Sequence, residues 1–263
     1  DGVSTWGVGP VRSARVGHCW LREEWNAGFL FYGGQTYPGS SINDVFAANG
    51  LSRKTGKNAN DIFVLFDGTV SESKSHPWKQ YYGRRPGIVA PHNVWADVAS
   101  MAALISDDNN VPNHAFLFTD DVPESNDFAE DIYINWYIQY SSHLVYDFDS
   151  NAYFRYMIYP NGVEVPYEDR DSGELMSFNN VIIQFTPTTY SVADAPTTVT
   201  VGEGNADFFM GGVHVAGYWK RENGSSRTVF YGPDGNEMPL QRGRTLIVLF
   251  PYNNDLGKTV SYE

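Results

Sequence analysis

The stretch VIIQF at residues 181–185 decides how the second half of the chain folds. It joins β-branched and aromatic residues over a length that is typical of one buried strand. Similar stretches rich in Tyr, Phe, Val and Ile are predicted as strands at residues 144–148, 153–159, 198–201, 213–219, 227–231 and 245–250. Pairs that favour tight hairpin turns lie among them, namely Asn161-Gly162, Gly211-Gly212, Asn223-Gly224 and Asp234-Gly235. The second half is therefore predicted to be an antiparallel β domain.

The residues before this β region show helical periodicity instead. Ser13, Ser40 or Ser41, and Asn93 are suited to cap helices, and Gly28 is suited to end the first of them. The predicted helices cover residues 13–26, 40–50 and 93–105, and the predicted strands cover residues 29–32 and 62–66. This alternation of helices and strands indicates an α/β arrangement.

An acidic stretch separates the two halves. Between residues 119 and 131 six acidic side chains accompany proline, serine and asparagine, which is typical of a solvated linker or a long loop. We place the domain boundary in this stretch. The predicted fold class is α+β, with an N-terminal α/β domain over residues 1–125 followed by a smaller, antiparallel β-rich C-terminal domain over residues 126–263.

Composition limits the functions that the chain can have. Its 263 residues include 31 acidic and 18 basic side chains, which gives a formal net charge of −13. We expect no binding to nucleic acid, because phosphate neutralisation needs clustered Lys and Arg. Hydrophobic residues make up 42%, enough for a core, but no apolar run is long enough to span a bilayer. The single cysteine, Cys19, cannot form an intramolecular disulfide and is predicted to be a small buried hydrophobe.

Two predicted helix starts carry donors suited to an anion. Arg12 precedes Ser13 and Arg15 lies in the first helical turn, so two guanidinium groups accompany free backbone N–H groups. His92 and Asn93 precede the third predicted helix, where His92 can act as an acid or base or donate to an anion. The alternatives are that both arginines pair with internal carboxylates and that His92 and Asn93 only form structural hydrogen bonds.

The sequence contains no recognised catalytic or metal-binding motif. A nucleophile elbow, a metalloprotease helix and a phosphate-binding loop are all missing. Residues 147–151 begin like a calcium loop, but Ala152 and Ile158 stand where Gly and Glu are required. No metal and no cofactor is therefore predicted. A further set of aromatic residues could form a sugar-stacking platform, although such residues more often fill the core: Trp78, Tyr81, Tyr82, Trp136, Tyr137 and Tyr140.

Several different short motifs are distributed along nearly the whole chain. In the first half they are GPVRSAR at 9–15, YGG at 32–34, Arg84 or Arg85, and APHN at 90–93. In the second half they include Tyr153, Arg155, NG at 161–162, DSGE at 171–174, NVIIQ at 180–184 and GYWK at 217–220. In this combination the chain resembles the YerB-type lipoprotein family, whose function is unknown. It departs from that family at Val16, where proline is usual, and at Tyr32, where histidine or a similar residue is common.

The resemblance implies an extracytoplasmic protein of the bacterial cell envelope. Such a protein is anchored at the outer face of the cytoplasmic membrane by a lipid on an N-terminal cysteine, which is missing from this chain. Membrane contact is expected only through that anchor. Together, the motifs and the resemblance select the candidate ligand-binding residues Arg12, Ser13, Arg15, Tyr32, Gly33, Gly34, Arg85, His92 and Asn93.

Three kinds of function are consistent with these residues. The favoured hypothesis is a non-catalytic envelope lipoprotein that binds an anionic small molecule, an anionic envelope polymer or a protein partner. The alternative is a phosphotransferase or hydrolase that acts on a phosphorylated envelope precursor, since phosphoryl transfer needs positioning and charge neutralisation more than a nucleophile. A third hypothesis is a structural adaptor that presents the β domain to other proteins. Whether the chain is an enzyme stays open, and the lack of a complete catalytic set favours binding.

Overall fold

The computed structural model describes residues 7–34, 41–52, 55–57, 64–68, 79–105, 116–135, 140–170, 172–190, 196–252 and 257–263. These residues are mostly β, with few helices and mainly antiparallel sheets. Their contacts divide the chain into two units of similar length. The first unit takes its described residues from 1–114, 189–200 and 224–227, and the second from 115–188, 201–223 and 228–263. No helix within the described ranges is both long and apolar enough to cross a bilayer.

The first unit is built on short strands. Strand β1 (Phe29–Phe31) pairs in parallel with β2 (Leu65–Asp67). Strand β3 (Tyr82–Arg84) forms an antiparallel hairpin with β4 (Val94–Ala96). All three residues of β4 are buried, because the strand has neighbours on both of its edges.

Helices cover the parallel strands of the first unit. They are α1 (Val16–Trp25), α2 (Ile42–Ala48), α4 (Val98–Ala102) and the short 3-10 helix η1 (Lys79–Tyr81). Cys19 of α1 and Phe46 of α2 pack with Phe31 and Leu65 into one buried cluster. The hairpin of β12 (Thr188–Tyr190) and β13 (Pro196–Thr198) comes from the second half of the sequence, and its strand β13 contacts α1.

The helix limits differ from the sequence prediction at several points. Helix α1 begins after Arg15, so the prediction that Ser13 caps it was wrong, and it ends at Asn26, whose left-handed backbone (φ 43°) closes the helix before Gly28. Helix α2 begins as predicted, because the Ser41 hydroxyl accepts a hydrogen bond from the backbone N–H of Asn43.

The third predicted helix, over residues 93–105, was wrong in its first part. Residues 94–96 form β4, and the helix begins only after Asp97, whose carboxylate accepts a hydrogen bond from the backbone N–H of Ser100. Pairing with the distant residues Val8 and Val11 decides the strand state of this segment. Such long-range pairing overrides the local helical pattern.

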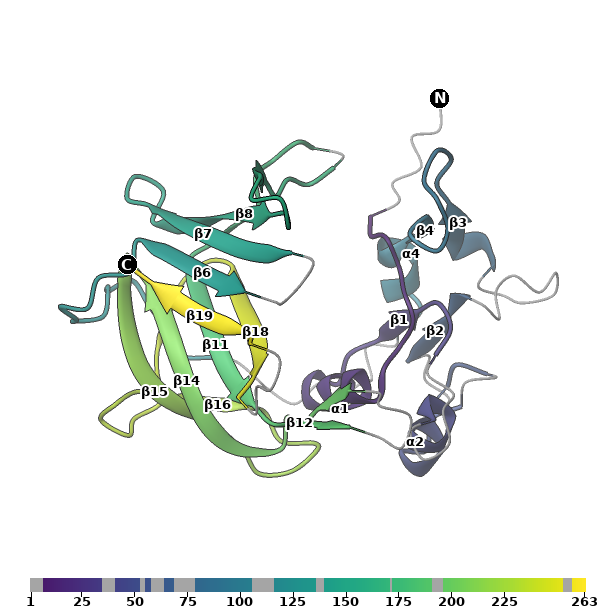
Figure 1. Ribbon diagram of the computed structural model, residues 1–263. Coiled ribbons are helices and arrows are strands. Elements are labelled where there is room, and N and C mark those ends of the chain that lie inside the picture. Colours follow the sequence, from purple (N-terminus) through teal and green to yellow (C-terminus); the bar gives the residue numbers. More distant parts are fainter. Residues whose placement is uncertain are drawn as a thin grey trace. The chain divides into compact units, whose positions relative to one another are not determined.

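The second unit contains two stacked sheets (Figure 1). The first has the order β10 (Ser177–Phe178), β8 (Ala152–Ile158), β7 (Ser141–Asp147), β6 (Asp131–Asn135) and β19 (Thr259–Tyr262), with β9 (Glu164–Pro166) also paired to β8. The second has the order β16 (Val229–Tyr231), β15 (Val213–Arg221), β14 (Gly202–Met210), β11 (Asn180–Thr186) and β18 (Thr245–Pro251). A separate pair joins β5 (Phe118–Thr119) and β17 (Leu240–Gln241).

Strand β11 lies at the centre of the second unit and is buried on both faces. Val181 and Ile183 point into the core between the two sheets, together with Ile132 and Leu144 of the facing sheet. Ile182 points to the opposite face, into a second core. Burial on both faces explains why this strand is a continuous apolar run and does not alternate with polar residues.

Two features of the second unit differ from the prediction. Strand β11 pairs with β18 in parallel, and β5 pairs with β17 in parallel, so the β region is not purely antiparallel. The strand predicted at residues 198–201 is also wrong, since β13 ends at Thr198 and the next strand, β14, begins at Gly202. The Gly211-Gly212 pair forms the predicted hairpin turn between β14 and β15, with φ values of 63° and 76°.

Candidate functional site

The segment that carries Arg12 lies between β1 and β4 of the first unit. The Val11 N–H donates to the Val94 carbonyl at 2.8 Å, and the Tyr32 N–H donates to the Arg12 carbonyl at 2.9 Å. The Ala14 N–H donates to the Gly33 carbonyl at 3.1 Å. These backbone bonds fix Arg12 beside the end of β1 and beside the hairpin loop that precedes β4.

The Arg12 side chain reaches across to the loop before β4. Its Nη1 lies 2.9 Å from Nδ1 and 3.3 Å from Nε2 of His92. A guanidinium group only donates, so the ring nitrogen that accepts its hydrogen bond carries no proton. Both side chains are exposed to solvent. The exposed guanidinium therefore has further N–H groups besides the one that contacts the imidazole ring.

A second guanidinium group, that of Arg84, joins the same cluster from β3. Its Nη1 donates to Oδ1 of Asn93 at 2.9 Å, and its Nη2 donates to the Tyr32 hydroxyl. The Arg84 guanidinium carbon also lies 5.1 Å from the centre of the Tyr32 ring. These contacts hold the plane of the guanidinium group in one orientation. Since His92 and Asn93 are neighbours in the chain, the two arginines contact consecutive residues of one loop.

The turn that follows β1 lies next to these residues and is fixed by hydrogen bonds of its own. Gly33 adopts a left-handed backbone (φ 79°), which a residue with a side chain would adopt only with strain. Its N–H donates to Oδ1 of the completely buried Asp67 at 3.3 Å. The hydroxyl of Tyr82 donates to the Phe66 carbonyl at 2.5 Å and lies 3.3 Å from the Phe31 carbonyl. Burial, followed by the charge of Asp67, raises the pKa of this tyrosine. A hydrogen bond to β2 therefore holds the turn, and Tyr82 links β3 to the two parallel strands.

The side chains of three predicted site residues, Ser13, Arg15 and Arg85, do not take part in the contacts among Arg12, Tyr32, Arg84, His92 and Asn93. Arg15 is the N-cap residue of α1, and the closest bond of its guanidinium is to the Ala14 carbonyl at 3.5 Å. The half-buried Ser13 lies between Arg12 and Ala14 and does not cap the helix. The Arg85 guanidinium stacks on the Trp95 ring at 4.1 Å, while its backbone N–H donates to the Asn93 carbonyl. The structure thus gives Arg84 the position that the sequence assigned to Arg85.

The helix start at Arg15 has its own local chemistry. The Arg15 backbone N–H donates to Nδ1 of His18 at 3.1 Å. Burial and then the positive charge of Arg15 lower the pKa of His18, which keeps the ring neutral and able to accept this bond. His18 thus takes the place that Glu or Gln fills in the usual capping box.

The charges of the cluster decide what it can bind. Within the described ranges neither Arg12 nor Arg15 forms an ion pair with a carboxylate. The described residues also hold no group of three or more His, Cys, Asp or Glu side chains placed to bind a metal ion. We define the cluster of Arg12, Tyr32, Arg84, His92 and Asn93 as the arginine cluster. It presents N–H donors and positive charge, which suit phosphate or carboxylate oxygens.

Two of three comparisons with known proteins find a match. Residues 132–247 match the family described as protein of unknown function (DUF3048) C-terminal domain. The crystal structure of the YerB protein from Bacillus subtilis has the same fold, with a TM-score of 0.69 and 20% sequence identity. The similar region covers 97% of this chain and 77% of the Bacillus subtilis chain. The comparison with curated proteins finds no match.

Proposed function

We propose that this chain, which has the fold of the YerB protein and a region that matches the DUF3048 C-terminal domain of unknown function, is a non-catalytic binding protein of the bacterial cell envelope. In this proposal the arginine cluster binds an anionic group of a small molecule or an envelope polymer. The observation that carries the proposal is the meeting of two guanidinium groups with His92 and Asn93, where Arg12 has no carboxylate partner among the described residues.

The geometry suits a phosphate or carboxylate group in particular. Arg12 is exposed and keeps donors available beside His92, so an anion can accept from the guanidinium and from the imidazole together. Arg84 is already oriented by Asn93 and Tyr32, so less side-chain entropy is lost when a ligand binds. In this proposal Arg12 and His92 contact the anion directly. The backbone of the turn at Gly33 holds the segment that carries Arg12 in place.

The proposed location follows from the family resemblance. A lipid anchor on the full-length protein would hold these two units outside the cytoplasmic membrane, where phosphate-bearing envelope polymers are accessible. The test is cell fractionation of the full-length protein, followed by protease treatment of intact protoplasts. If the protein is recovered in the membrane fraction and is degraded by protease added to intact protoplasts, the proposed location is supported. If the protein is recovered in the cytosolic fraction, the proposed location is overturned.

Calorimetric titration tests the ligand class directly. Inorganic phosphate and pyrophosphate are titrated into the wild type, Arg12→Gln and Arg84→Gln. Each substitution removes a charge-assisted hydrogen bond or its support, so we expect roughly tenfold weaker binding from either one. Arg170→Gln, an exposed arginine of the second unit, is the matched control because it changes the net charge equally. No binding to the wild type, or equal weakening by all three substitutions, would remove the proposed site.

The same titration separates binding from catalysis. Phosphate release from pyrophosphate is followed alongside the heat of binding. Binding without release of phosphate supports a binding protein. Release that Arg12→Gln abolishes would replace the proposal with the phosphotransferase or hydrolase alternative.

A further inference from the structure

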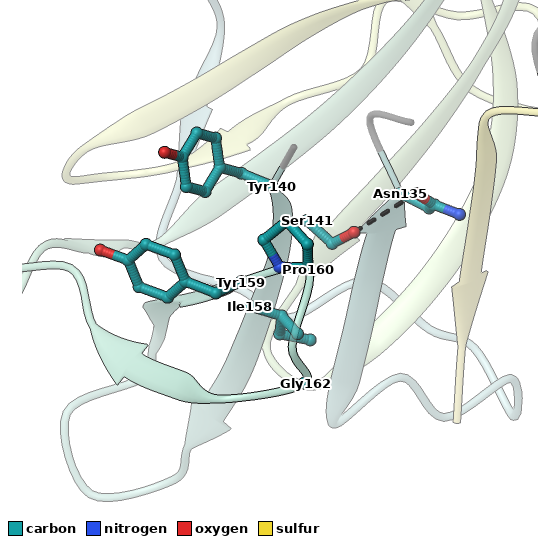
Figure 2. Close-up of a pocket in the computed structure, with 7 residues that line it drawn as sticks. All are labelled: Asn135, Tyr140, Ser141, Ile158, Tyr159, Pro160 and Gly162. Carbon is teal, nitrogen blue, oxygen red and sulfur yellow. Dashed lines mark hydrogen bonds between the residues drawn. The ribbon is translucent and has the colours of Figure 1, made fainter. Parts of the chain in front are cut away.

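The second unit has a cavity of about 260 Å³ at one end of its first sheet (Figure 2). Its walls are formed where β6 ends, where β7 begins and where β8 turns into β9. The lining consists of Asn135, Tyr140, Ser141, Ile158, Tyr159, Pro160 and Gly162. None of these residues carries a formal charge, although the whole chain has a net charge of −13.

Strand register brings the cavity walls together. Ser141 pairs with Asn135 on one side and with Ile158 on the other. Tyr140 and Tyr159 lie one residue beyond these pairs, so their rings become neighbours, with centroids 5.3 Å apart and planes at 78°. The turn that follows is tight, because Gly162 takes a left-handed backbone (φ 79°) and its N–H donates to the Tyr159 carbonyl at 2.8 Å.

The two tyrosines are unusually open for rings in mutual contact. Tyr140 is 47% exposed and Tyr159 is 39% exposed, so a large part of each ring is available to a ligand. In Figure 2 both hydroxyl groups point away from Asn135 and Ser141, which leaves the apolar ring surfaces beside the cavity. On the opposite wall Ser141 Oγ lies 3.3 Å from Asn135 Oδ1 and forms a hydrogen bond with it. One wall is therefore aromatic and the other carries amide and hydroxyl groups.

We propose that this cavity binds one pyranose ring of an uncharged saccharide. A pyranose has an apolar face of C–H groups, which packs on aromatic rings, and a rim of hydroxyl groups, which exchange hydrogen bonds with amide and hydroxyl side chains. The cavity is smaller than most sites for drug-sized ligands, and its size therefore suits one ring. The described lining residues carry no charge, which favours a neutral ligand over an ionic one.

Saccharide titration followed by two-dimensional NMR tests the proposal. The probes are triacetylchitotriose and maltotriose, and a proline-rich decapeptide is included because aromatic grooves also bind such peptides. We expect at least one saccharide to bind with a Kd below about 10 mM. Tyr140→Ala and Tyr159→Ala should each weaken that binding about tenfold, while Tyr140→Phe should keep most of it, since stacking needs the ring and not the hydroxyl group.

Two controls make the outcome specific to this cavity. Tyr252→Ala removes another exposed tyrosine of the second unit and should leave saccharide binding unchanged. Arg12→Gln should also leave it unchanged, so the saccharide site and the anion site can fail separately. Circular dichroism confirms that each variant is folded. No saccharide binding by the wild type, binding of the peptide alone, or saccharide binding that survives both alanine substitutions overturns the proposal.

Discussion

Asp207→Asn should destabilise the protein more at low pH than at high pH. His214 is only 8% exposed and lies between two carboxylates, with Nδ1 2.8 Å from Asp127 Oδ2 and Nε2 3.0 Å from Asp207 Oδ1. Carboxylates only accept hydrogen bonds, so both contacts are satisfied together when both ring nitrogens donate, which is the case in the imidazolium form of the ring. The Tyr262 hydroxyl donates to the same Asp127 oxygen at 2.9 Å and completes the group.

The sign of the pH dependence follows from the direction of the pKa change. Burial alone would lower the pKa of His214, but the hydrogen bonds and charges of Asp207 and Asp127 outweigh burial and raise it above its usual 6.5. A raised pKa in the folded state means that this stabilisation is fully present below pH 6.5 and is lost as the pH rises through the folded-state pKa. Asn keeps the shape of Asp207 but not its charge.

The size of the effect follows from the exposure of the pair. A hydrogen bond to a charged group contributes roughly 1.5–3 kcal/mol when it is shielded from water. The Asp207 side chain is 25% exposed, so solvent screening should reduce the loss on Asp207→Asn to about 1 kcal/mol. For a unit of this length that loss corresponds to a Tm lower by about 4 °C.

Thermal unfolding of the full chain measures the effect at about pH 6 and about pH 9. The variant and the wild type must be compared at each pH, so that the pH dependence of all other groups cancels in the difference. Asp149→Asn, an exposed carboxylate of the second unit, is the control. A Tm difference that is equal at both pH values, or greater at pH 9, refutes the reasoning. So does an NMR titration of His214 with a midpoint below 6.5.

Three further predictions concern the cores of both units. Asn180 is completely buried and hydrogen-bonded to the backbone of β17, so Asn180→Ala should cost about 2–3 kcal/mol in urea unfolding; a loss below about 0.5 kcal/mol would contradict this. Burial raises the pKa of the Cys19 thiol to about 12. Ellman's reagent should therefore label Cys19 at about pH 8 only when urea unfolds the chain. Rapid labelling of the folded chain would contradict the burial of this thiol. Gly217→Ala would place Cβ 2.1 Å from the Tyr231 carbonyl oxygen and should lower the free energy of unfolding by roughly 3 kcal/mol. Gly224→Ala is the control, because a Cβ atom there meets open space. Equal effects of the two substitutions would contradict the close packing around Gly217.

Local sequence patterns correctly predicted those strands of the second unit that are rich in apolar residues. The VIIQF strand, the strands around residues 144–148 and 153–159 and the Gly211-Gly212 turn are all confirmed. Strand β14 was not predicted because its first half, GEGNAD, has the residues of a turn. Its strand state comes from pairing with β11 and β15 on both sides, which no local pattern reveals. The parallel pairing of β11 with β18 likewise joins segments far apart in the sequence.

The candidate site was predicted in part. Sequence motifs selected Arg12, His92 and Asn93, and the structure brings these residues into one set of contacts. The sequence selected Arg85 and not Arg84, because the motif contains both arginines and no local pattern shows which side chain faces Asn93. Pairing of β3 with β4 directs Arg84 to Asn93, and Arg85 stacks on the Trp95 ring.

The position of a bound anion would show whether the arginine cluster is a binding site. Tungstate, an electron-dense analogue of phosphate, can be soaked into crystals of the protein and located by its anomalous scattering. We expect a tungstate ion in hydrogen-bond contact with the Arg12 guanidinium and the His92 ring, and its loss in crystals of Arg12→Gln. Tungstate bound only elsewhere, or at this position in the variant as strongly as in the wild type, would show that the arginine cluster is not an anion site.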